Sequence, residues 1–183
     1  ELSGEVSFSV RKAHYVCEQA RELNAQGDGA TAAKLLQAAI AEAPDAPRPR
    51  LLLGQLQLNM GQAQQACDTL GQLFEQGSVA APLACSSLVR AAQAAQRVPQ
   101  TLQLLQSHYA QSPGIDVMDA IVSLEKANEA SEEQTRQRYI EHLQKRCLVG
   151  DRFDYMGFET ALVIGATLAP HLECEVLHRA SHL

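Results

Sequence analysis

The sequence predicts an all-α protein, a right-handed α-solenoid built from antiparallel helix pairs. The first observation is an internal echo, in which small and aliphatic residues return 34 positions further along: Ala20, Gly27, Ala32, Leu36 and Ala39, then Gly54, Gly61, Ala66, Leu70 and Leu73. A period of this length around a helix–turn–helix pattern is typical of stacked helical repeats. The second observation is composition, since Ala, Leu and Gln abound and aromatic residues make up only 4 % of the 183 residues. Those three abundant residues are good helix formers.

We expect one domain, made of four repeats and a terminal helix. The repeats span about 13–46, 47–80, 81–114 and 115–149, and a capping helix at about 153–169 and a tail at 170–183 follow. The cap is expected because a solenoid leaves the apolar face of its last repeat bare unless another element covers it. The outer side of this cap is itself apolar, so we expect a neighbouring domain or a second subunit to pack on it.

The first repeat is predicted as two helices joined by a glycine turn. Ala20 and Leu23 mark the first helix, and the glycines of residues 26–29 stop it. Ala32 and Leu36 mark the second helix at helical spacing. Small residues at positions 20 and 32 are expected where the paired helices cross closely.

The second repeat follows the same pattern most closely, and the later repeats depart from it. Gly54 and Gly61 of the second repeat stand 34 residues after their counterparts. In the third repeat, Thr101 and Leu105 match only after one inserted residue. The fourth repeat is predicted from apolar residues that follow Ile115 at helical spacing.

Charge and cysteine usage exclude some classes of function. The net charge of −6 argues against a nucleic-acid binder, which usually carries a basic field. Five widely spaced cysteines without a C-x-x-C pair are typical of free thiols in a reducing compartment, so we expect a cytoplasmic protein. No apolar run reaches the ~20 residues of a membrane span. The chain begins without Met, so we expect a fragment, and an upstream membrane anchor stays open.

The C-terminal tail carries zinc-ligand types, namely His171, Cys174, His178 and His182. On a continuous helix the first and last of them lie roughly 16 Å apart, so the four cannot meet at one ion. Two neighbours could supply half a site, and a polar helix without metal explains the pattern equally. We expect no metal and no cofactor.

The first helix of the first repeat carries His14 and Cys17 three residues apart. Cysteine–histidine catalysis needs the two side chains in contact, a third orienting group and a cleft, and spacing alone supplies none of these. The sequence also lacks G-x-S-x-G, H-E-x-x-H, G-x-G-x-x-G and phosphate-loop motifs. We expect a buried or groove-lining pair without chemistry, and a protein that is not an enzyme.

The repeat resembles the tetratricopeptide repeat (TPR). The Leu-Gly pair at 53–54, Gly61 and Ala66 stand where that family places its Leu-Gly, its turn glycine and its packing alanine. The family's Trp near the start and Tyr at the eleventh position are missing from the first two repeats, and we expect smaller aliphatic groups to fill those spaces. The resemblance implies a scaffold that binds other proteins.

The same resemblance places a peptide-binding groove on the first helix of each repeat. The lining positions are the second, fifth, ninth and twelfth of each repeat. They carry His14, Cys17, Arg21 and Asn24 in the first repeat; Arg48, Leu51, Gln55 and Leu58 in the second; and Pro82, Cys85, Val89 and Ala92 in the third. We expect an extended or helical peptide of mixed character there, although ordinary solvated surface explains the same residues.

A finer resemblance rests on the segment AHYVCEQA at residues 13–20. It is similar to the A-H-x-x-C-E-L-A segment of the lipopolysaccharide assembly protein B family (LapB, also called YciM). That resemblance implies a bacterial scaffold tied to the inner membrane, with repeats facing the cytoplasm. Such a scaffold couples a membrane protease to the deacetylase that commits lipid A synthesis. The family's metal domain with two C-x-x-C pairs has no counterpart here, and a generic bacterial adaptor for assembly or secretion is the alternative.

Overall fold

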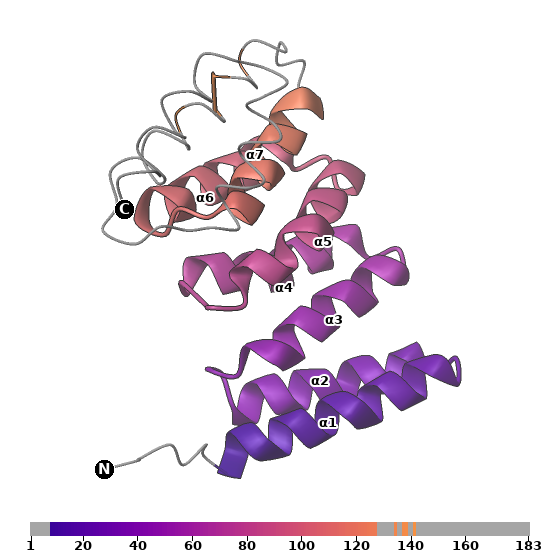
Figure 1. Ribbon diagram of the computed structural model, residues 1–183. Helices are drawn as coiled ribbons and strands as arrows, with labels where there is room; N and C mark the ends of the chain where they lie inside the picture. Colours follow the sequence, from indigo (N-terminus) through magenta and orange to yellow (C-terminus); the bar gives the residue numbers. More distant parts are fainter. Residues whose placement is uncertain (1–7, 128–133, 135–136, 139–140, 142–183) are drawn as a thin grey trace, which may run out of the picture. The chain divides into compact units, whose positions relative to one another are not determined.

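The structure is a computed structural model that describes residues 8–127, 134, 137–138 and 141 (Figure 1). Within these ranges it contains seven helices and no strand: α1 (Phe8–Ala25), α2 (Gly29–Glu42), α3 (Pro47–Asn59), α4 (Ala63–Glu75), α5 (Ala81–Ala94), α6 (Val98–Gln111) and α7 (Ile115–Ala127). The predicted all-α helical repeat is confirmed. The predicted capping helix and tail lie outside the described residues.

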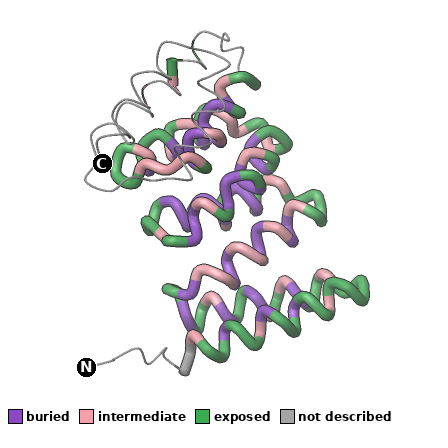
Figure 2. The backbone as a smooth tube through the Cα atoms, in the orientation of Figure 1, coloured by how far each residue is buried: buried purple, intermediate pink, exposed green. Residues whose placement is uncertain are grey.

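By its contacts the chain divides into two compact units, Glu1–His108 and Tyr109–Leu183, and each is described by itself. In the first unit α1 packs against α2, and α3 packs against α4 (Figure 1). Further contacts join α2 to α3 and α4 to α5, so each helix pair rests on the next. Buried positions recur along one side of each helix, as an amphipathic helix requires (Figure 2).

From the second helix pair on, the starts of the first helices follow the 34-residue period, whereas α1 begins at Phe8, 39 positions before α3. Helices α3, α5 and α7 begin at Pro47, Ala81 and Ile115, each 34 positions after the last. Helix α6 begins at Val98, however, 35 positions after α4 begins at Ala63. This difference is the inserted residue that the third repeat was predicted to contain.

The first helix of each pair ends in the same kind of turn. One residue in each turn has a left-handed backbone, with φ of 89° at Gly27, 75° at Gly61 and 57° at Gln96. In the first turn the N–H of Asp28 donates to the carbonyl of Leu23 at 2.9 Å, and the equivalent bond recurs in the other two turns. This is the Schellman arrangement that closes a helix, and it favours glycine.

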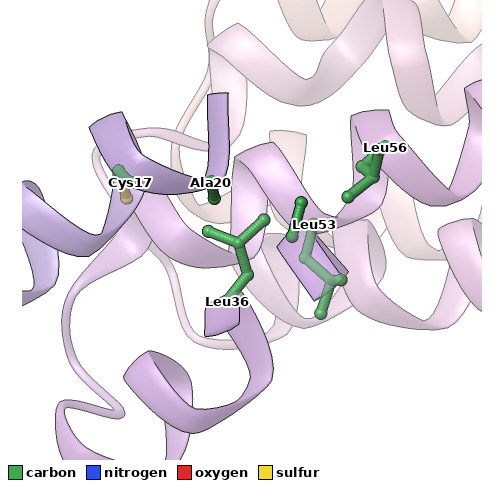
Figure 3. Close-up of a cluster of buried hydrophobic side chains, with 6 residues drawn as sticks. Cys17, Ala20, Leu36, Leu53 and Leu56 are labelled. Atoms are coloured by element: carbon green, nitrogen blue, oxygen red, sulfur yellow. The ribbon is translucent and has the colours of Figure 1, made fainter. Parts of the chain in front are cut away.

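A core cluster joins the first three helices. It contains Cys17, Ala20, Ala32, Leu36, Leu53 and Leu56, which come from α1, α2 and α3 (Figure 3). Small residues at positions 20 and 32 are buried, as the close crossing of paired helices requires.

Helices α3 and α4 approach closely at Gly54. A Cβ atom added to Gly54 would come within 2.4 Å of Cγ of Leu70, which is itself fully buried. A larger residue at this position would force the Leu70 side chain or the helices to shift, so glycine is the residue that fits the packing as it stands.

Two polar side chains occupy the buried face of α3, where aliphatic groups were expected. Arg50, near the start of the second repeat, is 5 % exposed, and Gln57, at its eleventh position, is 6 % exposed. The expectation of aliphatic fillers is therefore wrong for this repeat. Arg50 tolerates burial because its guanidinium donates to the carbonyl of Pro44 at 2.6 Å and to the side-chain oxygens of Gln72 at 3.0 Å and Gln76 at 3.1 Å.

The second unit contains α7 among its described elements. Val117, Ile121 and Leu124 are buried and stand four and three residues apart, which places them on one face of this helix. Beyond α7, the guanidinium of Arg138 pairs with the carboxylate of Glu125 at 2.9 Å.

Candidate functional site

Three of the predicted groove residues, His14, Arg21 and Arg48, come together around one carboxylate, that of Glu18. The guanidinium of Arg48 donates to Nδ1 of His14 at 2.9 Å and also pairs with Glu18. Arg21 approaches the same carboxylate at 3.4 Å. This network joins α1 to α3, which are the first helices of neighbouring repeats.

Sequence reasoning missed Glu18, although a signal was available. Glu18 stands four residues after His14 and three before Arg21, so the three side chains share one face of α1. A guanidinium can only donate, so Nδ1 of His14 is the acceptor in the bond to Arg48.

A pocket of about 110 Å³ lies beside this network, between α1 and α3. Its polar lining consists of the predicted residues Arg21, Asn24 and Gln55 together with Asn59, and its apolar lining includes Leu52 and Leu56. Amide side chains can pair with the N–H and C=O groups of a peptide backbone. The apolar part has room for one small side chain, so the surface suits a short peptide rather than a large cofactor.

Cys17 does not line this surface, contrary to the groove assignment. Its side chain is 0 % exposed, because Ala13, Cys17 and Ala20 lie four and three residues apart on the buried face of α1. Cys85, at the equivalent position of the third repeat, is buried as well. Burial raises the pKa of the Cys17 thiol more than the charge of Arg48 lowers it. The thiol therefore stays protonated and is a poor nucleophile.

The remaining candidates add no chemistry to this surface. Leu51 is half-buried on α3, outside the pocket lining. The C-terminal candidates for metal binding, His171, Cys174 and His178, lie outside the described residues. In the part of the chain that the structure describes, no three His, Cys, Asp or Glu side chains are placed to hold one metal ion.

These features define a helical-repeat protein whose α1–α3 surface combines charged groups, amides and a small apolar pocket. Residues 23–84 match the family model of the tetratricopeptide repeat, which supports the predicted tetratricopeptide repeat protein. Repeats of this kind support a protein-interaction scaffold and are typically non-enzymatic. The more specific resemblance to lipopolysaccharide assembly protein B stays a prediction.

Two further findings concern similarity to known proteins and the ability of the helices to cross a membrane. Comparison with curated proteins finds no match. Among the helices that the structure describes, none combines the length and the apolar character needed to cross a membrane.

Proposed function

We propose that this protein is a non-enzymatic scaffold that holds a segment of a partner protein on the α1–α3 surface. The observation that carries the proposal is the network of His14, Glu18 and Arg48 beside the amide-lined pocket. Each element contains one pair of residues at equivalent positions in neighbouring repeats, His14 with Arg48 in the network and Arg21 with Gln55 at the pocket. A peptide lying across the two helices would therefore meet polar side chains from both repeats.

The charges of this surface favour a segment with an acidic group. Arg21 and Arg48 share the single carboxylate of Glu18, so the arginines carry one positive charge in excess. These side chains are at least one-third exposed, and ion pairs of that kind contribute little to folding. A carboxylate of the partner could pair with an arginine here without breaking any bond that the fold needs.

A peptide selection tests this proposal. The probe is a phage-displayed library of random peptides, screened against the wild-type chain and against the variant Arg21→Glu with Arg48→Glu. We expect the wild type to select acidic peptides of mixed character and the variant to lose them while keeping its helical circular dichroism. The charge-matched control is Lys34→Glu with Arg90→Glu, at exposed basic residues of α2 and α5 that belong to neither the network nor the pocket lining. Equal affinity of both variants for the selected peptides would place binding elsewhere.

The finer proposal is a LapB-like regulator of bacterial lipopolysaccharide synthesis, acting in the cytoplasm. Its support is the segment at residues 13–20, in which His14 and Glu18 belong to the network. Cys17 and Cys67 are free thiols, which suits a reducing compartment. Retention of the membrane protease and the lipid A deacetylase from a bacterial extract by the wild type, and their loss with Arg48→Glu, would support this role. Retention of neither would favour the generic adaptor.

The proposal also includes an occupant for the predicted apolar helix at about 153–169, either a second copy of the chain or a neighbouring domain. Its support is the apolar outer face expected from the sequence. Light scattering of the chain over a range of concentrations tests the first occupant, because only self-association raises the mass with concentration.

A further inference from the structure

A second pocket lies between α4 and α6, on helices that the proposed function does not use. Its volume is about 290 Å³, and its buried lining includes Cys67, Leu88 and Thr101. This volume is at the lower end of the ~300–1,000 Å³ typical of ligand pockets, and the slot is large enough for a long side chain. All of its lining residues belong to the first unit.

Gly71 keeps the slot between α4 and α6 open. It lies in the middle of α4, where glycine is the poorest helix former apart from proline. A Cβ atom at this position would meet only Cδ2 of Leu104, at the ordinary contact distance of 3.4 Å. Neither a turn nor a steric clash therefore requires glycine here. What the missing side chain does provide is space in the slot.

Charge is unevenly distributed along the α4 edge of the slot. Asp68 and Glu75 stand seven residues apart, so both lie on the same face of the helix, separated by ~10 Å along its axis. Asp68 is already paired with Arg97, which also lines the slot. Glu75 is exposed and makes no ion pair with any residue that the structure describes. One end of the slot is therefore neutralised and the other end is acidic.

We propose that this slot receives an arginine or lysine side chain of a partner protein. The aliphatic stem would lie against Leu88 and Leu104, and the cationic head would reach Glu75. Long basic side chains commonly bury their stems in this way while the charge stays at the surface. The net charge of −6 adds a long-range attraction for a basic partner. This interaction is independent of the α1–α3 surface, so the scaffold would hold two segments of opposite charge.

Nuclear magnetic resonance titration of the full chain tests the proposal with defined probes. The first probe is N-acetyl-arginine amide, and the second is the citrulline analogue, which has nearly the same shape without the charge. We expect the arginine probe to shift the amide signals of Gly71, Glu75 and Leu104. It should bind about two- to fivefold more tightly than the citrulline probe, as one exposed ion pair allows. Added salt should remove this difference.

Two variants separate the slot from general charge effects. Glu75→Gln should abolish the preference for arginine, whereas Glu22→Gln, an equal charge change at an exposed position of α1, should leave it intact. Gly71→Leu should weaken both probes by filling the slot. If that variant does not fold, Gly71→Ala gives the same test with a smaller obstruction. Equal binding of the two probes to the wild type, or equal effects of Glu75→Gln and Glu22→Gln, would overturn the proposal.

Discussion

His14 on α1 and Arg48 on α3 are joined by a hydrogen bond of 2.9 Å and stand 34 residues apart, which is one repeat. The contact shows how the repeat builds a surface. Equivalent positions of neighbouring first helices come within reach of one another, so a pair of polar residues can act together although neither is near the other in sequence. In this protein the two equivalent positions carry a histidine and an arginine.

We expect Arg48→Met to change binding while leaving folding almost untouched. Its contacts with His14 and Glu18 are exposed, and exposed pairs contribute about 0–1 kcal/mol. Urea unfolding followed by circular dichroism measures the change in the free energy of unfolding. A loss well above that range would assign Arg48 to the fold instead of to the binding surface.

Gly54→Ala should destabilise the protein by about 1–3 kcal/mol, because the added methyl group overpacks the contact with the fully buried Leu70. The matched control is Gly71→Ala, where the new Cβ atom meets Leu104 at 3.4 Å. That variant should keep or raise the stability, since alanine is the better helix former by about 1 kcal/mol. Thermal unfolding of both variants provides the comparison. Equal effects would mean that α3 and α4 can move apart.

Gln96→Gly should stabilise the third turn. Gln96 has a φ of 57°, and a residue with a Cβ atom in this left-handed region costs about 1–2 kcal/mol relative to glycine. The reverse change, Gly61→Gln in the second turn, should lower the stability by a similar amount. Melting temperatures that move in the same direction for both variants would contradict the equivalence of the two turns.

Arg50→Met should cost about 1.5–3 kcal/mol, the value of a hydrogen bond that involves a charged group, because the carbonyl of Pro44 loses its guanidinium donor. Methionine retains much of the packing of the arginine stem. Gln57→Met is the contrasting change, since the buried side-chain oxygen of Gln57 has no hydrogen-bond partner in the described part of the chain. Removing that oxygen should leave the stability unchanged or raise it. The denaturant midpoint should fall for Arg50→Met and should stay the same or rise for Gln57→Met.

Alkaline pH should destabilise the protein through its buried thiols. Burial raises the pKa of both Cys17 and Cys67 above the ordinary value of about 8.5. A group with a raised pKa in the folded state contributes stability that is complete below its unfolded pKa. That stability is lost as the pH rises towards the folded pKa. Unfolding free energies measured between neutral pH and pH ~10 should therefore fall, and the variant Cys17→Ala with Cys67→Ala should fall less.

The reactivity of the same thiols gives a separate check. Iodoacetamide labelling followed by mass spectrometry should modify Cys17 and Cys67 far more slowly in the folded chain than in urea, because the thiolate is both disfavoured and covered. Rapid labelling under native conditions would show that α1 or α4 opens frequently.

The arrangement of helices could be predicted from the sequence because local signals fix it. Glycines such as Gly27 and Gly61 close the first helices, and Pro47 opens the second pair. The period then transfers these boundaries to later repeats, including the inserted residue before Val98. Such signals depend on a few neighbouring residues, so they can be recognised in the sequence without knowing the tertiary contacts.

The burial of individual side chains was harder to predict, because it depends on distant partners. Arg50 can be buried because acceptors on the preceding loop and on α4 satisfy its guanidinium, and no local sequence pattern brings these acceptors together. Cys17 was assigned to the groove by its position in the repeat, yet it belongs to the buried face of α1. The slot between α4 and α6 likewise depends on Gly71 and Leu104, which lie on different helices.

The inserted residue of the third helix pair does not change the spacing of the repeats that follow it. Helix α5 is 14 residues long where α3 has 13, yet α7 still begins at Ile115, 34 residues after the start of α5. The connection at 112–114 is two residues shorter than the connection at 76–80, which offsets the residue added in α5 and the one residue by which α6 (14 residues) exceeds α4 (13 residues). The one-residue displacement from the 34-residue period therefore affects only the start of α6. A 34-residue cassette copied from the second pair would fit the length of the third pair but would start its second helix one residue early.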